Sequence, residues 1–262
     1  MIKENKIALV TGAYGAIGFA ISKELAFSGF EVILVGRSER RLEEAVSTIR
    51  VLNEDAKVWY EVVDVSRKNS ILELKRRWTG SLDVLINNAA TTPRDRSETL
   101  DGLELQFATN IMGYFWMMHY LRSFLKQSSN PQIINVASYW TGGLDITDMQ
   151  FTNRAYDNDS AYRQSKQANR MLTVAFAELY QKDGINVNSC HPGDVNSKLS
   201  NNLGFGGYQL PEDAATTPVW LAKNNFENTT GKYFENKTEV RCGFSQNKKA
   251  IDELYRFCLK FV

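Results

Sequence analysis

Short apolar runs alternate with amphipathic stretches along the chain. Six runs rich in β-branched residues fit buried strands, at 7–10, 32–35, 58–63, 84–86, 133–136 and 185–187. Between them, apolar residues recur at helical spacing, as at positions 17, 21 and 25 before Gly29 and at 42, 45, 46 and 49 after Ser38 as N-cap. Strict alternation of strand and helix leads to right-handed crossovers. We therefore predict an α/β fold with a single doubly wound parallel sheet and helices on both faces.

The composition predicts one domain over residues 1–262. This length is enough for an α/β domain with a large core, and no linker, repeat or break in composition divides it. The 31 Lys and Arg residues balance 30 Asp and Glu residues without a long run of one sign. Such a balance favours neither nucleic acid nor an anionic membrane surface as a partner.

The N-terminal segment and the cysteines indicate in which cellular compartment the protein resides. Segment 1–6 is polar and leads directly into the first predicted strand, and no apolar run approaches the length of a membrane span. The chain has three cysteines without CxxC spacing, Cys190, Cys242 and Cys258. Their odd number and their spacing argue against a disulfide framework and against a zinc site. We expect a soluble cytoplasmic protein that holds no metal.

A glycine-rich stretch, TGAYGAIG at 11–18, joins the first predicted strand to the first predicted helix. Glycine permits a positive φ and close approach, and the free N–H groups of a helix N-terminus attract anions. An ordinary tight turn would use the same residues. The spacing from Gly12 to Gly18 nevertheless favours a dinucleotide pyrophosphate.

Polar and small residues follow the next strands. Arg37 and Ser38 come after the second strand, where an NAD-binding protein would place a carboxylate. Arg37 favours NADP, because its charge suits a 2′-phosphate, although solvated arginines are common in loops. Asp64 and Val65 follow the third strand and Asn-Asn-Ala-Ala at 87–90 the fourth, where small residues let a cofactor lie across the sheet edge.

Tyr162 and Lys166 are four residues apart and share one face of a predicted helix. An ammonium group beside a phenol favours the phenolate, so we expect Lys166 to lower the Tyr162 pKa from about 10. The pair suits acid/base chemistry, but the same spacing also occurs by chance on solvated helices. Ser138 follows the fifth strand and places a hydroxyl at the edge where ligands bind.

These motifs, in this order, resemble the short-chain dehydrogenase/reductase family over nearly the whole chain. The matching positions are TGAYGAIG, Asp64, NNAA, Asn110, Ser138, Tyr162 with Lys166, and His191-Pro192-Gly193. The resemblance implies a Rossmann fold. The long aromatic segment between Ser138 and Tyr162, with HPGDVNSKL and TGKYFENK, is most similar to the retinol dehydrogenase and carbonyl reductase-like branch.

The resemblance implies four catalytic roles. Tyr162 exchanges a proton with the substrate oxygen, and Lys166 holds the nicotinamide ribose and depresses the tyrosine pKa. Ser138 hydrogen-bonds the substrate oxygen. Asn110 holds a helix distortion and a water that relays protons to Lys166. The implied cofactor-binding residues are Gly12, Tyr14, Gly15, Ala16, Ile17, Gly18, Arg37, Ser38, Asp64, Val65, Asn88, Ala89, Ala90, Tyr162, Lys166, Pro192, Gly193, Val195 and Ser197.

Two positions depart from the family pattern. Ala16 stands where the family has glycine, with Gly15 one position earlier, and Ala90 ends NNAA where the family has NNAG. We expect a slightly shifted pyrophosphate turn. For the substrate, we expect Trp140 and Phe205 to form apolar walls beside Ser138 and Tyr162, under a movable lid at 196–208.

The sequence thus predicts an NADP-dependent reductase of bulky, lipophilic aldehydes or ketones. An NAD-dependent alcohol dehydrogenase working oxidatively and a non-catalytic cofactor-sensing protein remain alternatives. Homodimer, homotetramer and monomer all stay open.

Overall fold

The computed structural model describes residues 5–224 and 229–262, so most of the polar segment 1–6 lies outside the described residues. One sheet runs through the molecule in the order β3-β2-β1-β4-β5-β6-β7-β8, and only the pair β7 and β8 is antiparallel. The strands are β1 (Ile7–Thr11), β2 (Glu31–Gly36), β3 (Val58–Val62), β4 (Val84–Asn87), β5 (Gln132–Val136), β6 (Asn186–His191), β7 (Tyr233–Glu235) and β8 (Thr238–Glu239).

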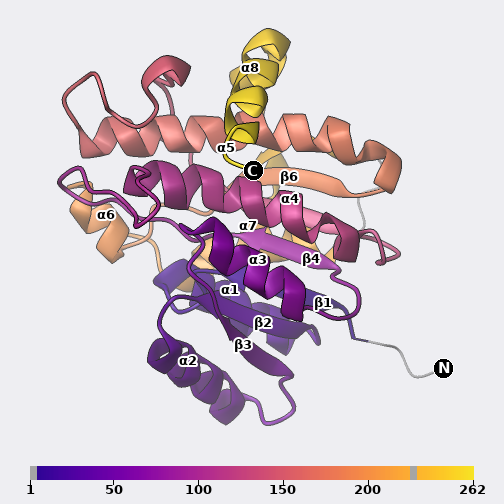
Figure 1. Ribbon diagram of the computed structural model, residues 1–262. Coiled ribbons are helices and arrows are strands. Elements are labelled where there is room, and N and C mark those ends of the chain that lie inside the picture. Colours follow the sequence, from indigo (N-terminus) through magenta and orange to yellow (C-terminus); the bar gives the residue numbers. More distant parts are fainter. Residues whose placement is uncertain (1–4, 225–228) are drawn as a thin grey trace.

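Helices connect the strands and cover both faces of the sheet (Figure 1). The α-helices are α1 (Ala16–Phe27), α2 (Glu39–Leu52), α3 (Lys68–Arg77), α4 (Gly113–Leu125), α5 (Asn158–Tyr180), α6 (Lys198–Asn202), α7 (Pro211–Lys223) and α8 (Lys248–Leu259). A π-helix, η1 (Phe107–Met112), leads into α4. Short 3-10 helices are η2 (Ile146–Asp148), η3 (Gln181–Asp183) and η4 (Gly243–Gln246).

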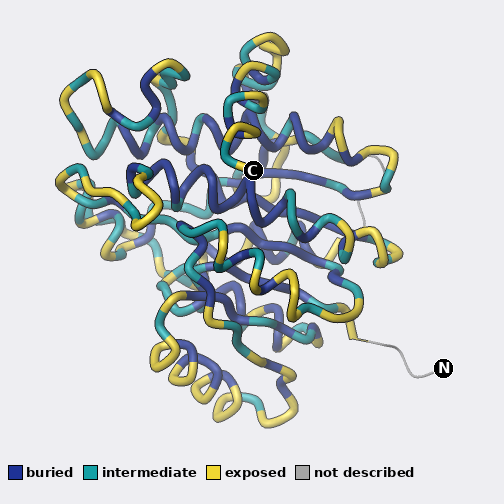
Figure 2. The backbone as a smooth tube through the Cα atoms, viewed as in Figure 1, coloured by how far each residue is buried: buried dark blue, intermediate teal, exposed yellow. Residues whose placement is uncertain are grey.

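The alternating pleat of the strands divides the apolar residues between two cores. In β1, Ala8 and Val10 pack with α1, α2 and α7, whereas Leu9 packs with α3, α4, α5 and α8. Figure 2 shows the result, with the strands buried and the outer turns of α2 exposed. A strand covered on both faces has no solvent side, which is why β1, β2 and β4 contain continuous apolar runs.

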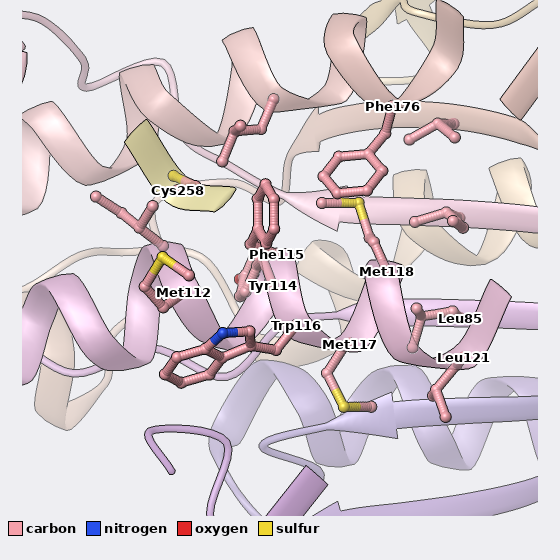
Figure 3. Close-up of a cluster of buried hydrophobic side chains, with 14 of the residues drawn as sticks. Leu85, Met112, Tyr114, Phe115, Trp116, Met117, Met118, Leu121, Phe176 and Cys258 are labelled. Carbon is pink, nitrogen blue, oxygen red and sulfur yellow. The ribbon is translucent and has the colours of Figure 1, made fainter. Parts of the chain in front are cut away.

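The first half of helix α4 lies inside the second core and is apolar on every side. Its consecutive residues from Gly113 to Met118 are all buried. In Figure 3, Met118 points toward Phe176 of α5, and Met112 lies near Cys258 of α8. Trp116 Nε1 donates a hydrogen bond to Phe261 O at 3.2 Å, which ties the chain end to this helix. A helix segment that is hydrophobic on every side is typical of a buried core position.

The predicted fold class is confirmed: a doubly wound sheet, parallel apart from one edge pair, carries helices on both faces. All six predicted strands exist, with small differences at their ends, and β6 extends to His191. Strands β7 and β8 were not predicted, because they contain only three and two residues.

Candidate active site

The glycine-rich turn lies between β1 and α1. Gly12 has a φ of 66°, which favours glycine, and its carbonyl accepts a hydrogen bond from Gly15 N at 3.0 Å. A Cβ at Gly18 would lie 2.3 Å from the Gly12 oxygen, so a larger residue needs the turn to move. The first turn of α1 has no side-chain cap and no acidic residue. Its free N–H groups suit a pyrophosphate, so these residues fit a nicotinamide dinucleotide.

The glycine-rich turn keeps its hydrogen bond between Gly15 N and Gly12 O despite the two departures from the family pattern. Ala16 is the exposed first residue of α1. Gly15 before it is extended, with φ −77° and ψ 164°, which any residue can adopt. Ala90 is half-buried after β4. The glycine shifted by one position therefore needs no special backbone conformation.

Hydrogen bonds tie the end of β4 to the end of β1. Asn88 N and Ala89 N both donate to Thr11 Oγ1, at 2.9 and 3.0 Å, and Asn88 Nδ2 donates to Thr11 O at 2.9 Å. A Cβ at Gly12 would lie 2.9 Å from Ala89 Cα, so the two segments touch at the glycine. The structure brings these expected cofactor positions to one edge of the sheet.

Two arginines follow β2. Arg37 is exposed, and its side chain makes no hydrogen bond or ion pair with any residue in the described part of the chain. The guanidinium carbon of Arg41 lies 4.3 Å from the centre of the Tyr14 ring, and Nη2 donates to Tyr14 O at 3.4 Å. Gly36 makes room for this ring, because a Cβ there would lie 2.4 Å from Tyr14 Cε1. Arg41 is missing from the sequence prediction, although it lies in the first turn of α2, close to Arg37 in the sequence.

The positions after β2 and β3 are held locally. Ser38 is the N-cap of α2, as predicted, but its side chain makes no capping hydrogen bond. Asp64 Oδ1 accepts hydrogen bonds from Ser66 N at 3.0 Å and from Ser66 Oγ at 2.7 Å. Val65 is buried beside Gly113, where a Cβ would lie 2.9 Å from the Val65 oxygen. The turn after β3 thus fixes the Asp64 carboxylate.

Tyr162, Lys166 and Ser138 meet where α5 crosses the end of β5. Lys166 Nζ lies 5.6 Å from the centre of the Tyr162 ring and donates to Val136 O at 2.9 Å. Ser138, two residues beyond that carbonyl, lies close enough to the Tyr162 side chain to lower its pKa. Three side chains that are up to 28 residues apart in sequence are thus brought together by one helix and one strand end.

Burial controls the protonation of this pair. It raises the pKa of Tyr162 from 10.0 to about 12, while the side chain of Ser138 lowers it in part. Burial also lowers the pKa of Lys166 from 10.5 to about 7. The predicted lowering of the Tyr162 pKa by Lys166 is therefore wrong, because burial raises this pKa and Nζ is bound to Val136 O. Tyr162 is protonated at neutral pH.

Asn110 lies in η1, and this π-helix is the helix distortion expected there. The side chain clamps one residue from both sides: Oδ1 accepts from Thr91 N at 2.8 Å, and Nδ2 donates to Thr91 O at 3.0 Å. Nδ2 also lies 3.3 Å from Ser165 Oγ on α5. Asn110 therefore joins η1, α5 and the segment after β4.

The loop after β6 holds the remaining predicted cofactor positions. Pro192 and Gly193 follow the strand, and Gly193 has a φ of 118°. Val195 is buried and forms an isolated parallel bridge with Gln209. Ser197 caps α6, because its Oγ accepts from the backbone N of Ser200 at 3.2 Å. The Ser197 hydroxyl thus caps α6, a role that was not predicted from the sequence.

Two aromatic residues follow Ser138 directly, and the first of them contacts a carboxylate in the loop after β6. Trp140 and Phe205, the predicted apolar walls, are 45% and 51% exposed. Tyr139 OH donates to Asp194 Oδ2 at 3.0 Å and so joins the loops after β5 and β6. Asp194 is missing from the sequence prediction, although a carboxylate directly after Gly193 was a visible signal.

The segment predicted as a lid rests against the start of α5. Asn202 Nδ2 donates to Thr92 O at 3.2 Å, and Asn158 Nδ2 donates to Asn202 O at 3.1 Å. Thr92 Oγ1 also lies 3.4 Å from Leu199 O. These contacts hold α6 between the segment after β4 and α5.

The family profile described as short chain dehydrogenase matches residues 6–204. The chain belongs to this family. Retinol dehydrogenase 13 of Mus musculus is 33% identical over 256 residues, covering 90% of this chain and 77% of that protein. A probable oxidoreductase of Streptomyces antibioticus is 31% identical and covers 89% of this chain and 86% of that protein. These relatives place the short-chain dehydrogenase in the retinol dehydrogenase-like branch, as its motifs predicted.

Solved structures share its fold. A crystal structure of an uncharacterized protein from Mycobacterium paratuberculosis has a TM-score of 0.83 at 23% identity, covering 97% of this chain and 92% of that one. A variant of actinorhodin polyketide ketoreductase, solved with NADPH, has a TM-score of 0.69 at 21% identity, covering 92% and 98%. Among the described residues of this short-chain dehydrogenase, no helix has the length and apolar character of a membrane span.

Proposed function

We propose that this short-chain dehydrogenase reduces a bulky, lipophilic aldehyde or ketone to an alcohol with NADPH, and that Tyr162 donates the proton. The observation that carries the proposal is the grouping of Tyr162, Ser138 and Lys166 at the end of β5. When bound, the cofactor supplies the hydride. All three side chains are present and lie near one another at the end of β5, which disfavours the non-catalytic alternative.

Each side chain has a role that its surroundings support. With a pKa near 12, Tyr162 keeps its proton at neutral pH and is able to donate it to a carbonyl oxygen. Ser138 hydrogen-bonds the same oxygen and stabilises the charge that develops on it. Lys166 binds the nicotinamide ribose by exchanging its hydrogen bond to Val136 O. An oxidative dehydrogenase would instead need Tyr162 to release its proton first, against the raised pKa.

Arg37 and Arg41 support NADP over NAD. Both follow β2, no carboxylate takes the place of Arg37, and its side chain has no partner among the described residues. Arg41 lies over Tyr14, in the glycine-rich turn that suits the pyrophosphate. A guanidinium and a phosphate form charge-assisted hydrogen bonds, and the resemblance to NADPH complexes in fold is consistent with this choice.

Replacing these arginines tests the cofactor choice. Arg37→Ala and Arg41→Ala should each raise the Kd for NADPH about tenfold to a hundredfold, because one charged hydrogen bond contributes roughly 1.5–3 kcal/mol. The Kd for NADH should change little. Arg40→Ala is the matched control, since Arg40 pairs with Glu44 at 2.6 Å on the same helix. Equal losses for both cofactors would remove the 2′-phosphate contact.

The surroundings of Ser138 support a largely apolar substrate. Trp140 and Phe205 offer apolar surface, and burying it favours large substrates over small polar ones. Tyr139 and Asp194 add a polar edge that suits a substrate with one hydrogen-bond donor. The test compares kcat/KM for a large hydrophobic ketone with that for a small polar one. A preference for the small polar ketone would contradict the proposed pocket.

A further inference from the structure

Arg170 is a buried arginine on the same face of α5 as Tyr162 and Lys166. It follows them by eight and four residues, and its side chain is only 9% exposed. Burying a guanidinium group is costly unless hydrogen bonds and nearby charges compensate for the lost water. The contacts of Arg170 therefore indicate its role.

The guanidinium group joins β7 to the end of β5. Its carbon lies 3.4 Å from the centre of the Tyr233 ring, and Nη2 lies 4.0 Å from Glu235 Oε1. The same Nη2 donates a hydrogen bond to Ser138 O at 2.5 Å. Tyr233 OH in turn donates to Glu235 Oε1 at 2.6 Å. An aromatic face, a carboxylate and a carbonyl oxygen thus hold Arg170 in one place.

Helix α5 is hydrogen-bonded to the end of β5 twice. Lys166 binds Val136 O, and Arg170 binds Ser138 O. The proposed function gives Lys166 a second partner, the nicotinamide ribose, so its bond to Val136 is exchangeable. Arg170 has no competing ligand in that function. Its bond to Ser138 therefore persists when Lys166 changes partner.

We propose that Arg170 is a positioning residue that sets the place of the Ser138 hydroxyl group, an inference that rests on the proposed role of Ser138 in carbonyl reduction. Fixing the carbonyl oxygen fixes the backbone from which Oγ extends. The amide of Trp140 reports on that hydroxyl, because Trp140 N donates to Ser138 Oγ at 3.0 Å. A displacement of about 1 Å at such a group costs on the order of a hundredfold in rate.

The first test replaces Arg170 and separates kcat from cofactor binding. Arg170→Met should lower kcat for the carbonyl substrate on the order of tenfold to a hundredfold and leave the Kd for NADPH within about twofold. Arg170→Lys keeps a donor and should recover part of kcat. The matched control is Arg122→Met, because Arg122 also lies over an aromatic ring, Tyr180 at 4.7 Å, and beside a carboxylate, Asp183 at 2.6 Å, without contacting Ser138.

A double-mutant cycle distinguishes positioning from general stability. If Arg170 acts through Ser138, then Arg170→Met adds little to the loss already caused by Ser138→Ala. Independent, multiplicative losses would overturn the proposal, and so would an equal loss of kcat in Arg122→Met and Arg170→Met. The thermal midpoint of each variant shows whether it is folded.

Hydrogen exchange tests the positioning role without turnover. In Arg170→Met, the Trp140 amide should exchange faster than in the wild type, since its acceptor has moved, while amides in α2 keep their rates. Unchanged exchange at Trp140 would overturn the positioning role. If Trp140 exchanges faster in Arg170→Met but the wild-type enzyme reduces no carbonyl, the proposed function is contradicted while the positioning of Ser138 by Arg170 still holds.

Discussion

Burial, rather than charge pairing, sets the protonation of the two central residues. Tyr162 is 7% exposed and Lys166 is 2% exposed. Desolvation disfavours the charged form of each group, so the pKa of the tyrosine rises and that of the lysine falls. The site thus holds a protonated phenol beside an amine that titrates near neutral pH, as a proton donor and an exchangeable hydrogen-bond donor require.

The lowered pKa of Lys166 predicts a pH-dependent stability. The folded protein binds this proton at a pKa of about 7 and the unfolded chain at 10.5, so unfolding becomes less favourable as the pH rises between those values. Lys166→Met should therefore stabilise the fold most at about pH 6. That advantage should shrink by about 3 kcal/mol at about pH 9, at roughly 1.4 kcal/mol per pH unit. Urea unfolding at both values measures it, and a pH-independent difference would contradict the lowered pKa.

Residues brought together by one helix or one motif could be predicted from the sequence. Tyr162 and Lys166 are an example, because their spacing alone places them on one face of α5. The same spacing places Arg170 on that face, but the contacts of Asp194 with Tyr139 and of Arg170 with Ser138 could not be found in this way, since these partners are 55 and 32 residues apart in the sequence. The pKa directions also depend on burial, which spacing does not supply.

At the scale of elements, the strand-to-helix turn after β1 depends on which glycine is replaced. Gly18→Ala should lower stability and raise the Kd for NADPH at least about tenfold, because its Cβ would lie 2.3 Å from the Gly12 oxygen. Ala16→Gly is the control, since the Ala16 side chain is exposed and its removal leaves the Gly12–Gly18 contact unchanged. Thermal melts and NADPH titration of both variants measure the effect. Normal binding by Gly18→Ala would show that the turn is not the pyrophosphate site.

The sequence predicts β1, β2 and β4 well because each contains a continuous apolar run, whereas β6 is largely polar and only its first residues were predicted. Strands β7 and β8 are too short for such a run, and their pairing depends on contacts with β6 and with each other. The π-helix at 107–112 is predicted only through the resemblance at Asn110. Its apolar residues continue the stripe of α4, so periodicity alone does not separate a π turn from an α turn.

At the scale of the molecule, we propose that the chain unfolds as a single unit. One sheet separates the two cores, and every described strand from β1 to β6 contributes buried residues. Leu9→Ala in one core and Leu34→Ala in the other should each cost about 2–5 kcal/mol. Each should shift one common transition in circular dichroism and tryptophan fluorescence. Two separate transitions, with each variant moving only one, would contradict a single domain.

The central claim is that Tyr162 donates the proton in an NADPH-dependent carbonyl reduction. The most direct test follows NADPH oxidation with a bulky ketone in the wild type and in Tyr162→Phe, with NADPH binding measured by fluorescence titration. Removing the phenol oxygen removes the donor and leaves the ring, so turnover should fall about a thousandfold while the Kd for NADPH stays within about twofold. A Tyr162→Phe variant that binds NADPH normally and keeps more than about a tenth of the wild-type rate would contradict the account.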